Sequence, residues 1–154
     1  MSRIYVASSW RNETQPIVVA SLRERGHEVY DFKNPREGDH GFHWSDVGMP
    51  TYDRATNSDV PVQEYLSGIE HPIALAGFRS DFEAMEWADT CVLVLPCGRS
   101  AHLELGWFVG AGRRTAILLD GPMVTPELMY RMVDLRTPDL DEVCDWVAGV
   151  VKVA

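Results

Sequence analysis

The chain has 154 residues, about the size of one domain, and its 45% hydrophobic and 24% charged residues are ordinary for a globular protein. It carries 14 Lys and Arg against 23 Asp and Glu, which gives a formal net charge of −9 at pH 7. This acidic balance argues against nucleic-acid polymers and anionic membranes as partners, because both favour a basic surface. A small anionic ligand stays possible, since it needs only one local positive pocket.

The cysteines and the N-terminus bear on the compartment. Cys91, Cys97 and Cys144 form no Cys-x-x-Cys pair, so we expect a reducing environment and no disulfide framework. The first residues contain no charged region followed by a long apolar stretch, and no apolar run approaches the ~20 residues that a membrane span needs. We therefore expect a cytoplasmic protein without a signal peptide.

The first 32 residues predict a β-α-β unit. Residues 3–8 (RIYVAS) are apolar and β-prone, and residues 27–32 (HEVYDF) form a second such run. Between them, Pro16 suits the first turn of a helix, and Gly26 suits the position just after its end. This spacing predicts two parallel strands joined by a right-handed crossover.

Residues 33–59 show no periodic pattern and are rich in glycine, proline and polar residues. The stretch also contains Phe42, Trp44 and Tyr52, which disordered linkers tend to lack, so we interpret it as an ordered flap over a site. Its acidic and histidine side chains form a weak metal-ligand pattern to which we assign no metal. Those side chains are Asp39, His40, His43 and Asp46.

The rest of the chain alternates helices and strands. In order, we expect helices over 61–69 and 80–88, a strand over 90–95, a helix over 100–112, a strand over 115–119, a short helix over 125–132, a weak strand over 133–135 and a helix over 139–151. Ser80 and Glu83 match a capping box at the start of the second helix, and Thr125 matches a cap of the short one. The last helix is amphipathic, with Leu140, Val143, Trp146, Val147 and Val150 on one side.

This alternation predicts a three-layer α/β fold, a flavodoxin- or Rossmann-like parallel sheet of about five strands in a single domain. In such sheets ligands bind at the carboxyl ends of the strands. The loops after Ser8, Phe32, Leu95 and Leu119 are therefore the places to search for a site.

Glu104 is the one polar residue in the segment 103–111 (LELGWFVGA). A helix that is apolar on all sides is expected to be buried, and a buried carboxylate is costly unless it is paired or functional. A capping box with Ser100 fails by one position, because Leu103 occupies the place where the acidic residue would stand. We interpret Glu104 as a functional carboxylate near a strand end, with an ion pair to an arginine as the alternative. His102, two positions earlier, points away from it on a helix and receives no role.

The first β-to-α turn contains Ser8, Ser9 and Arg11. Hydroxyls, an arginine and exposed N–H groups at such a turn can hold a phosphate, although a helix cap with a solvated arginine explains them equally well. The turn is neither a Walker loop nor a dinucleotide fingerprint. Asp81, considered alone, is explained by the favourable helix dipole at a first turn.

Three segments together resemble one family. They are residues 4–11 (IYVASSWR), residues 80–83 (SDFE) with the following Ala-Asp at 88–89, and residues 98–106 (GRSAHLELG). The chain resembles the nucleoside 2-deoxyribosyltransferase-like superfamily, which includes the 2′-deoxynucleoside 5′-phosphate N-hydrolases. The resemblance covers most of the chain, from Ile4 to about Leu119.

The resemblance implies cleavage or transfer of an N-glycosidic bond in a small nucleoside or nucleotide. Glu104 would attack the anomeric carbon and form a glycosyl-enzyme ester, and Asp81 would protonate or hydrogen-bond the leaving base. Tyr5 would position Glu104 or the sugar, and Ser9 and Arg11 would hold a 5′-phosphate. The resemblance implies a homo-oligomeric protein and no cofactor.

The chain also departs from the family. Arg99 and Ser100 stand near Glu104 with a spacing different from the family's Gly-Ser or Asp-Ser-Gly, and Arg99 adds a positive charge that can serve a phosphate. The 33–59 stretch looks longer than in small members and is expected to reshape substrate choice. Two alternatives stay open: an NAD-type glycohydrolase, and a nucleotide-binding module without catalysis.

Overall fold

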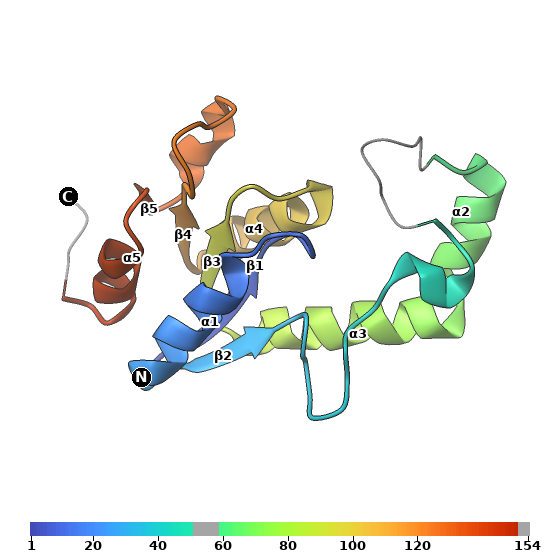
Figure 1. The fold of residues 1–154 in the computed structure, drawn as a ribbon, viewed down its shortest axis with the longest axis horizontal. Helices are drawn as coiled ribbons and strands as arrows, with labels where there is room; N and C mark the ends of the chain where they lie inside the picture. The colour runs from blue at the N-terminus through green and yellow to red at the C-terminus, as the bar shows by residue number, and fades with distance from the viewer. Residues whose placement is uncertain (51–58, 151–154) are drawn as a thin grey trace. The chain divides into compact units, whose positions relative to one another are not determined.

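The computed structural model describes residues 1–50 and 59–150 (Figure 1). The chain forms two compact units. Unit 1 comprises Met1–Phe32 with Ala84–Ala154, and unit 2 comprises Lys33–Glu83. Among the described residues, no helix is both long and apolar enough to cross a membrane.

Unit 1 is built on a sheet of five parallel strands (Figure 1). They are β1 (Arg3–Ala7), β2 (Glu28–Asp31), β3 (Thr90–Val94), β4 (Arg114–Leu118) and β5 (Leu135–Thr137). Their order in the sheet is β2-β1-β3-β4-β5, which confirms the predicted flavodoxin-like arrangement. The weak strand predicted over 133–135 begins two residues later, because Asp134 is used as a side-chain acceptor for the Thr115 N–H at 2.8 Å.

The first connection agrees with its predicted boundaries. Helix α1 (Gln15–Glu24) has a proline in its first turn, and Gly26 follows its end at φ +84°. The Gly26 N–H donates to the Arg23 carbonyl, and the His27 N–H donates to the Leu22 carbonyl. These two bonds form a Schellman motif, whose positive φ explains why glycine stands there.

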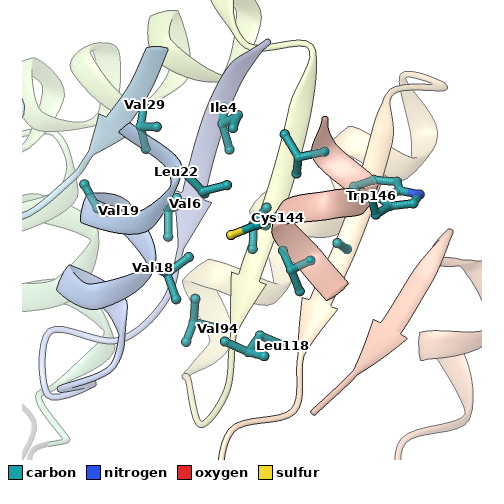
Figure 2. Close-up of a cluster of buried hydrophobic side chains, with 14 of the residues drawn as sticks. Ile4, Val6, Val18, Val19, Leu22, Val29, Val94, Leu118, Cys144 and Trp146 are labelled. Atoms are coloured by element: carbon teal, nitrogen blue, oxygen red, sulfur yellow. The ribbon is translucent and has the colours of Figure 1, made fainter. Parts of the chain in front are cut away.

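One face of the sheet is covered by α1 and α5 (Leu140–Val147), and the main core lies between them and the strands (Figure 2). Ile4 and Val6 of β1, Leu22 of α1 and Trp146 of α5 belong to this core. The last helix ends four residues before its predicted end at 151. Gly149, at φ +78°, stops it with a second Schellman motif, so Val150 is 74% exposed and lies outside the core.

The other face of the sheet is covered by α4 (Arg99–Gly110), which contacts β1, β3 and β4. Its inner side is formed by Ala101, Leu105 and Phe108, all buried. The expectation that this helix is buried on all sides is wrong, because Leu103 on the outer side is 77% exposed. Apolar composition alone therefore overstated the burial of α4.

The connection between β4 and β5 contains a short 3₁₀ helix, η2 (Leu128–Met132), in place of the helix predicted from Thr125. Its cap is Glu127, whose side chain accepts from the Met129 N–H at 2.8 Å. Serine, threonine, aspartate and asparagine are the usual residues at this position, so a glutamate cap has no clear signature in the sequence.

Unit 2 contains η1 (Trp44–Val47), α2 (Val62–Ile69) and most of α3 (Pro72–Trp87). The prediction for α2 is confirmed, but α3 begins at Pro72, eight residues before the predicted cap at Ser80. The capping-box interpretation is therefore wrong, since a proline in the first turn starts the helix and Ser80 lies in its middle. Asp81 is also mid-helix, so the first-turn dipole does not explain it.

Aromatic rings join the described part of the 33–59 stretch to the helices of unit 2, while Tyr52 lies outside the described residues. A flap over a site stays a prediction. Phe42 packs edge-on against Trp44 at 5.2 Å between ring centroids, and Trp44 in turn contacts Tyr65 of α2 at 5.9 Å. Gly77 of α3 allows the loop to approach, because a Cβ there would lie 2.7 Å from the Phe42 Cβ. Aromatic packing within unit 2 thus holds the loop onto its two helices.

Candidate active site

The turn after β1 brings the predicted phosphate-side residues to the carboxyl edge of the sheet. Ser8 donates its hydroxyl hydrogen to the Val94 carbonyl at 2.8 Å, which ties β1 to β3. The Ser9 hydroxyl accepts from the Arg11 N–H at 3.3 Å, and the Arg11 side chain is exposed. Ser8 therefore has a structural bond, whereas Ser9 and Arg11 form a turn at the strand end.

Asn12, which the sequence analysis did not single out, organises this turn. It is only 5% exposed, and its side-chain oxygen accepts from the N–H groups of Thr14 and Gln15 at 2.9 and 2.8 Å. Its side-chain nitrogen donates to the Pro96 carbonyl at 3.2 Å. Asn12 thus pairs two backbone N–H groups at the start of α1, whose N-cap residue is Thr14, and links the turn after β1 to the turn that leads into α4. The available signal in the sequence was an asparagine two residues before the N-cap Thr14, where its side chain can accept from the backbone two and three residues on.

Tyr5 is fully buried in the middle of β1, on the face covered by α4. Its ring stacks on Tyr30 of β2 with centroids 5.3 Å apart and contacts Phe108 of α4 at 5.8 Å. In the register of the sheet it stands beside Cys91 of β3. The ring therefore packs between the sheet and the helix that carries Glu104.

Glu104 lies on the inner side of α4, one turn before the buried Phe108 and partly buried itself. Since α4 starts at the carboxyl edge of the sheet, Glu104 lies nearer that edge than Phe108 does. Burial and the Glu104 carboxylate together raise the pKa of Cys97 to about 12, and the same two causes raise that of Cys91 well above its usual value. Glu104 contributes to both pKa shifts, so its carboxylate lies on the same side of the sheet as Cys91 of β3 and the following Cys97.

Arg99 and Ser100 occupy the first two positions of α4 and are exposed. The helix begins at Gly98, which provides no side-chain cap, so the N–H groups of its first turn are available to a ligand. Asn12 joins this turn to the turn carrying Arg11. Unit 1 therefore has two adjoining turns at one edge, each with an exposed arginine, and a carboxylate on the helix behind them.

His102 was given no role, yet the structure connects it to three neighbours. Its Nδ1 lies 2.7 Å from the Gly98 carbonyl and 3.6 Å from the Cys97 sulfur, and its Nε2 lies 2.8 Å from the Tyr130 hydroxyl. Helical spacing predicted that His102 points away from Glu104. It could not predict the contact of His102 with Tyr130, which is distant in the sequence.

Asp81 belongs to unit 2, where it lines a pocket of about 490 Å³ between the 35–46 loop and α3. Ser80 and Glu83 of the same helix and Arg36 and Phe42 of the loop also line it. The pocket combines both charge signs with an aromatic ring. The pairing of Asp81 with Glu104 stays a prediction.

The loop residues of the metal pattern have local roles. Asp39 accepts from the Gly41 N–H at 2.9 Å, and Asp46 accepts from the His43 N–H at 2.8 Å. Within 1–50 and 59–150, no group of three or more His, Cys, Asp or Glu side chains is arranged to hold a metal ion.

Comparisons with known proteins bear on the fold. No family model and no curated protein sequence matches the chain. A solved 2-deoxyribosyltransferase from Bacillus psychrosaccharolyticus is similar over 92% of this chain and 90% of its own, at 18% identity and a TM-score of 0.52. A CMP N-glycosidase from Clostridium botulinum, BcmB, aligns over 96% of this chain and 99% of its own, at 13% identity and a TM-score of 0.49. The likeness to the first of these enzymes shows that the chain has a 2-deoxyribosyltransferase-like fold.

Proposed function

We propose that this protein is an enzyme that cleaves the N-glycosidic bond of a nucleoside or nucleoside 5′-monophosphate, with Glu104 as the nucleophile. The observation that carries the proposal is the partly buried Glu104 on the sheet-facing side of α4, near the carboxyl edge. The likeness of the fold to a 2-deoxyribosyltransferase supports the same class of chemistry. The resemblance of three sequence segments to that family, centred on Tyr5, Asp81 and Glu104, adds to it.

The reaction has two steps. In the first, a Glu104 carboxylate oxygen bonds to the anomeric carbon while the bond from that carbon to the base nitrogen breaks. The base leaves with the bonding electrons and takes a proton from Asp81, which is left as a carboxylate. In the second step water, or the nitrogen of a second base, attacks the anomeric carbon, gives its proton to Asp81, and frees Glu104.

The carboxylate needs a fixed position to act as a nucleophile. Phe108, one turn further along α4, is fully buried against the Tyr5 ring and fixes the rotation of the helix about its axis. Tyr5, held in turn by Tyr30, is proposed to position Glu104 or the sugar. Asp81 keeps the role of acid at the leaving base that the family resemblance implies.

Two exposed arginines favour a substrate with a phosphate. Arg11 and Arg99 are on the turns that Asn12 joins, and the free N–H groups at the start of α4 add positive potential there. Ser9 and Ser100 provide hydroxyl donors on the same two turns. An acidic chain with net charge −9 can hold one small phosphate in such a place.

The test is a panel of nucleosides, nucleoside 5′-monophosphates and NAD incubated with the protein, with free base followed by chromatography. We expect base release from at least one nucleoside or monophosphate and its loss in Glu104→Gln. Glu24→Gln, an exposed glutamate at the end of α1, is the matched control and should retain full activity. Release from NAD alone would favour the NAD-type glycohydrolase, and binding without release would favour a nucleotide-binding module.

The phosphate role has its own test. Arg11→Ala should reduce kcat/KM for the monophosphate by about 10- to 100-fold, the range of a charge-assisted hydrogen bond of about 1.5–3 kcal/mol, and spare the nucleoside. Arg25→Ala is the control, because Arg25 forms a surface ion pair with Asp141 at the other end of α1. Equal losses on both substrates would remove this role from Arg11.

A further inference from the structure

Residues 121–132, here called the β4–β5 arm, extend from the carboxyl end of β4 and are unusually exposed. Every residue from 121 to 129 is exposed, and Tyr130 is the first that is not. Several apolar side chains of the arm lie open to solvent: Met123, Val124, Leu128, Met129 and Met132. Their packing alone therefore contributes little to holding the arm in place, so specific contacts have to do so.

Tyr130 provides such a contact. Its hydroxyl lies 2.8 Å from His102 Nε2, and the two rings are nearly parallel with centroids 5.8 Å apart. Burial, together with the neighbouring Cys97 and Glu127, raises the pKa of Tyr130, which keeps the phenol protonated. The arm is also tied to its own base, because Arg136 donates to the Tyr130 carbonyl at 3.0 Å.

The proton positions follow from the partners. A carbonyl oxygen only accepts, so His102 Nδ1, at 2.7 Å from the Gly98 carbonyl, carries the hydrogen. In the neutral ring Nε2 is then an acceptor, and the Tyr130 hydroxyl donates to it. The result is a chain of two hydrogen bonds that runs from the arm through the imidazole to the residue at the start of α4.

The hydrogen-bond chain adds a tie on the outer side of the start of α4, whose inner side is held by the buried Ala101. Gly98 has no side chain to cap the helix, and Arg99 and Ser100 are exposed. His102 lies in the first turn, two residues before Glu104, and its Nδ1 is 3.6 Å from the Cys97 sulfur. Cys97 is in turn close enough to Glu104 to feel its charge. Fixing the imidazole therefore fixes the loop and the helix turn beside the carboxylate.

We propose that Tyr130 and His102 are positioning residues for Glu104, with the Tyr130–His102–Gly98 hydrogen-bond chain holding the β4–β5 arm against the first turn of α4. The effect on catalysis rests on the proposed function, whereas the effect on the arm and the helix does not. Neither residue is required to touch the substrate. Tyr130 holds the arm at the carboxyl edge of the sheet, beside the turn that carries Arg99.

Tyr130→Phe tests this with the least disturbance, because it removes the hydroxyl and keeps the ring. Amide hydrogen exchange should rise in 121–132 and in 99–104 and stay unchanged in the central strands β1 and β3. With the best substrate, kcat should fall about tenfold, which equals about 1.4 kcal/mol, while KM changes much less. Tyr65→Phe is the matched control, because Tyr65 lies on α2 and is 41% exposed. It should change neither the amide exchange nor kcat.

A double-variant experiment separates one connected chain from two unrelated losses. His102→Asn keeps an amide donor for the Gly98 carbonyl and is too short to reach Tyr130. It should reproduce the effect of Tyr130→Phe, and the double variant should be no worse than either single one. Additive losses would overturn the claim that the two residues act through one bond.

The outcomes also separate this proposal from the proposed function. Unchanged exchange in Tyr130→Phe would overturn the positioning role whatever the activity. Raised exchange with an unchanged kcat would overturn the link to Glu104. If wild-type protein releases no base from any substrate, the proposed function fails, and exchange at 99–104 alone then decides whether Tyr130 positions the helix turn.

Discussion

Replacing Asn12 with alanine should destabilise unit 1 more than its single side chain suggests. The side-chain oxygen accepts from two backbone N–H groups at the start of α1, and the loss of such a cap costs about 1 kcal/mol. The side-chain nitrogen donates to the Pro96 carbonyl, and leaving a buried acceptor unpaired costs about 1–3 kcal/mol. The Val94 carbonyl keeps Ser8 as its donor and adds little to the loss. The sum predicts a loss of about 2–4 kcal/mol in the free energy of unfolding.

Urea unfolding followed by far-UV circular dichroism measures this free energy. The neighbouring Glu13→Ala is the control, because Glu13 is exposed and surface substitutions usually change stability by less than about 0.5 kcal/mol. If Asn12→Ala lowers the midpoint no more than Glu13→Ala does, Asn12 does not link the two turns, and the reasoning that brings Arg11 beside the start of α4 fails with it.

Three further predictions concern protonation, charge and packing. Burial and the N-terminal amino group lower the pKa of His27, so the folded state binds a proton at this histidine more weakly than the unfolded state does. The contribution of His27 to the free energy of unfolding should therefore be complete above the unfolded pKa of about 6.5 and be lost as pH falls below it. In thermal melts, His27→Gln should weaken this dependence of the melting temperature on pH. Glu104→Gln should speed alkylation of Cys97 by iodoacetamide, since each unit of pKa lost raises the thiolate fraction about tenfold; an unchanged rate would place the carboxylate elsewhere. Gly106→Ala has open space and should stabilise α4 by about 0.5–1 kcal/mol, whereas Gly77→Ala should destabilise because its Cβ meets the packed loop at 2.7 Å; the reverse order in urea unfolding would refute the packing.

The order of elements could be predicted from the sequence because local signals were sufficient for it. Pro16 and Gly26 mark the ends of a helix through the backbone geometry they prefer, and their spacing leaves room for one crossover between parallel strands. The continuous apolar run of β3 identified a strand buried on both faces. The alternation predicted a parallel α/β sheet, and the observed order β2-β1-β3-β4-β5 is the flavodoxin-like one of the two arrangements that it allowed.

The predictions failed where a local pattern has more than one meaning. Ser80 and Glu83 match a capping box, but the same spacing occurs within α3, whose start is marked only by Pro72. Apolar residues predicted a fully buried α4, but the pattern cannot distinguish an inner residue such as Leu105 from an outer one such as Leu103. Glu104 was predicted to be buried with the whole helix, and in the structure it is partly buried.

The contacts that organise the candidate site join residues far apart in the chain. Asn12 reaches the Pro96 carbonyl 84 residues away, and Tyr130 reaches His102 28 residues away. Helical periodicity fixes the side of α4 on which His102 lies, but the partner on that side depends on the path of the β4–β5 arm. Only the three-dimensional arrangement of the strands brings these pairs together.

The most direct test of Glu104 as the nucleophile is to find the sugar bonded to it. Wild-type protein is mixed with the panel member that it turns over best, quenched in acid within the first turnover, digested and analysed by mass spectrometry. The account predicts that the peptide containing Glu104 gains the mass of the sugar moiety without its base, and that Glu104→Gln gives neither this adduct nor free base. Equal turnover by wild-type protein and Glu104→Ala would contradict it.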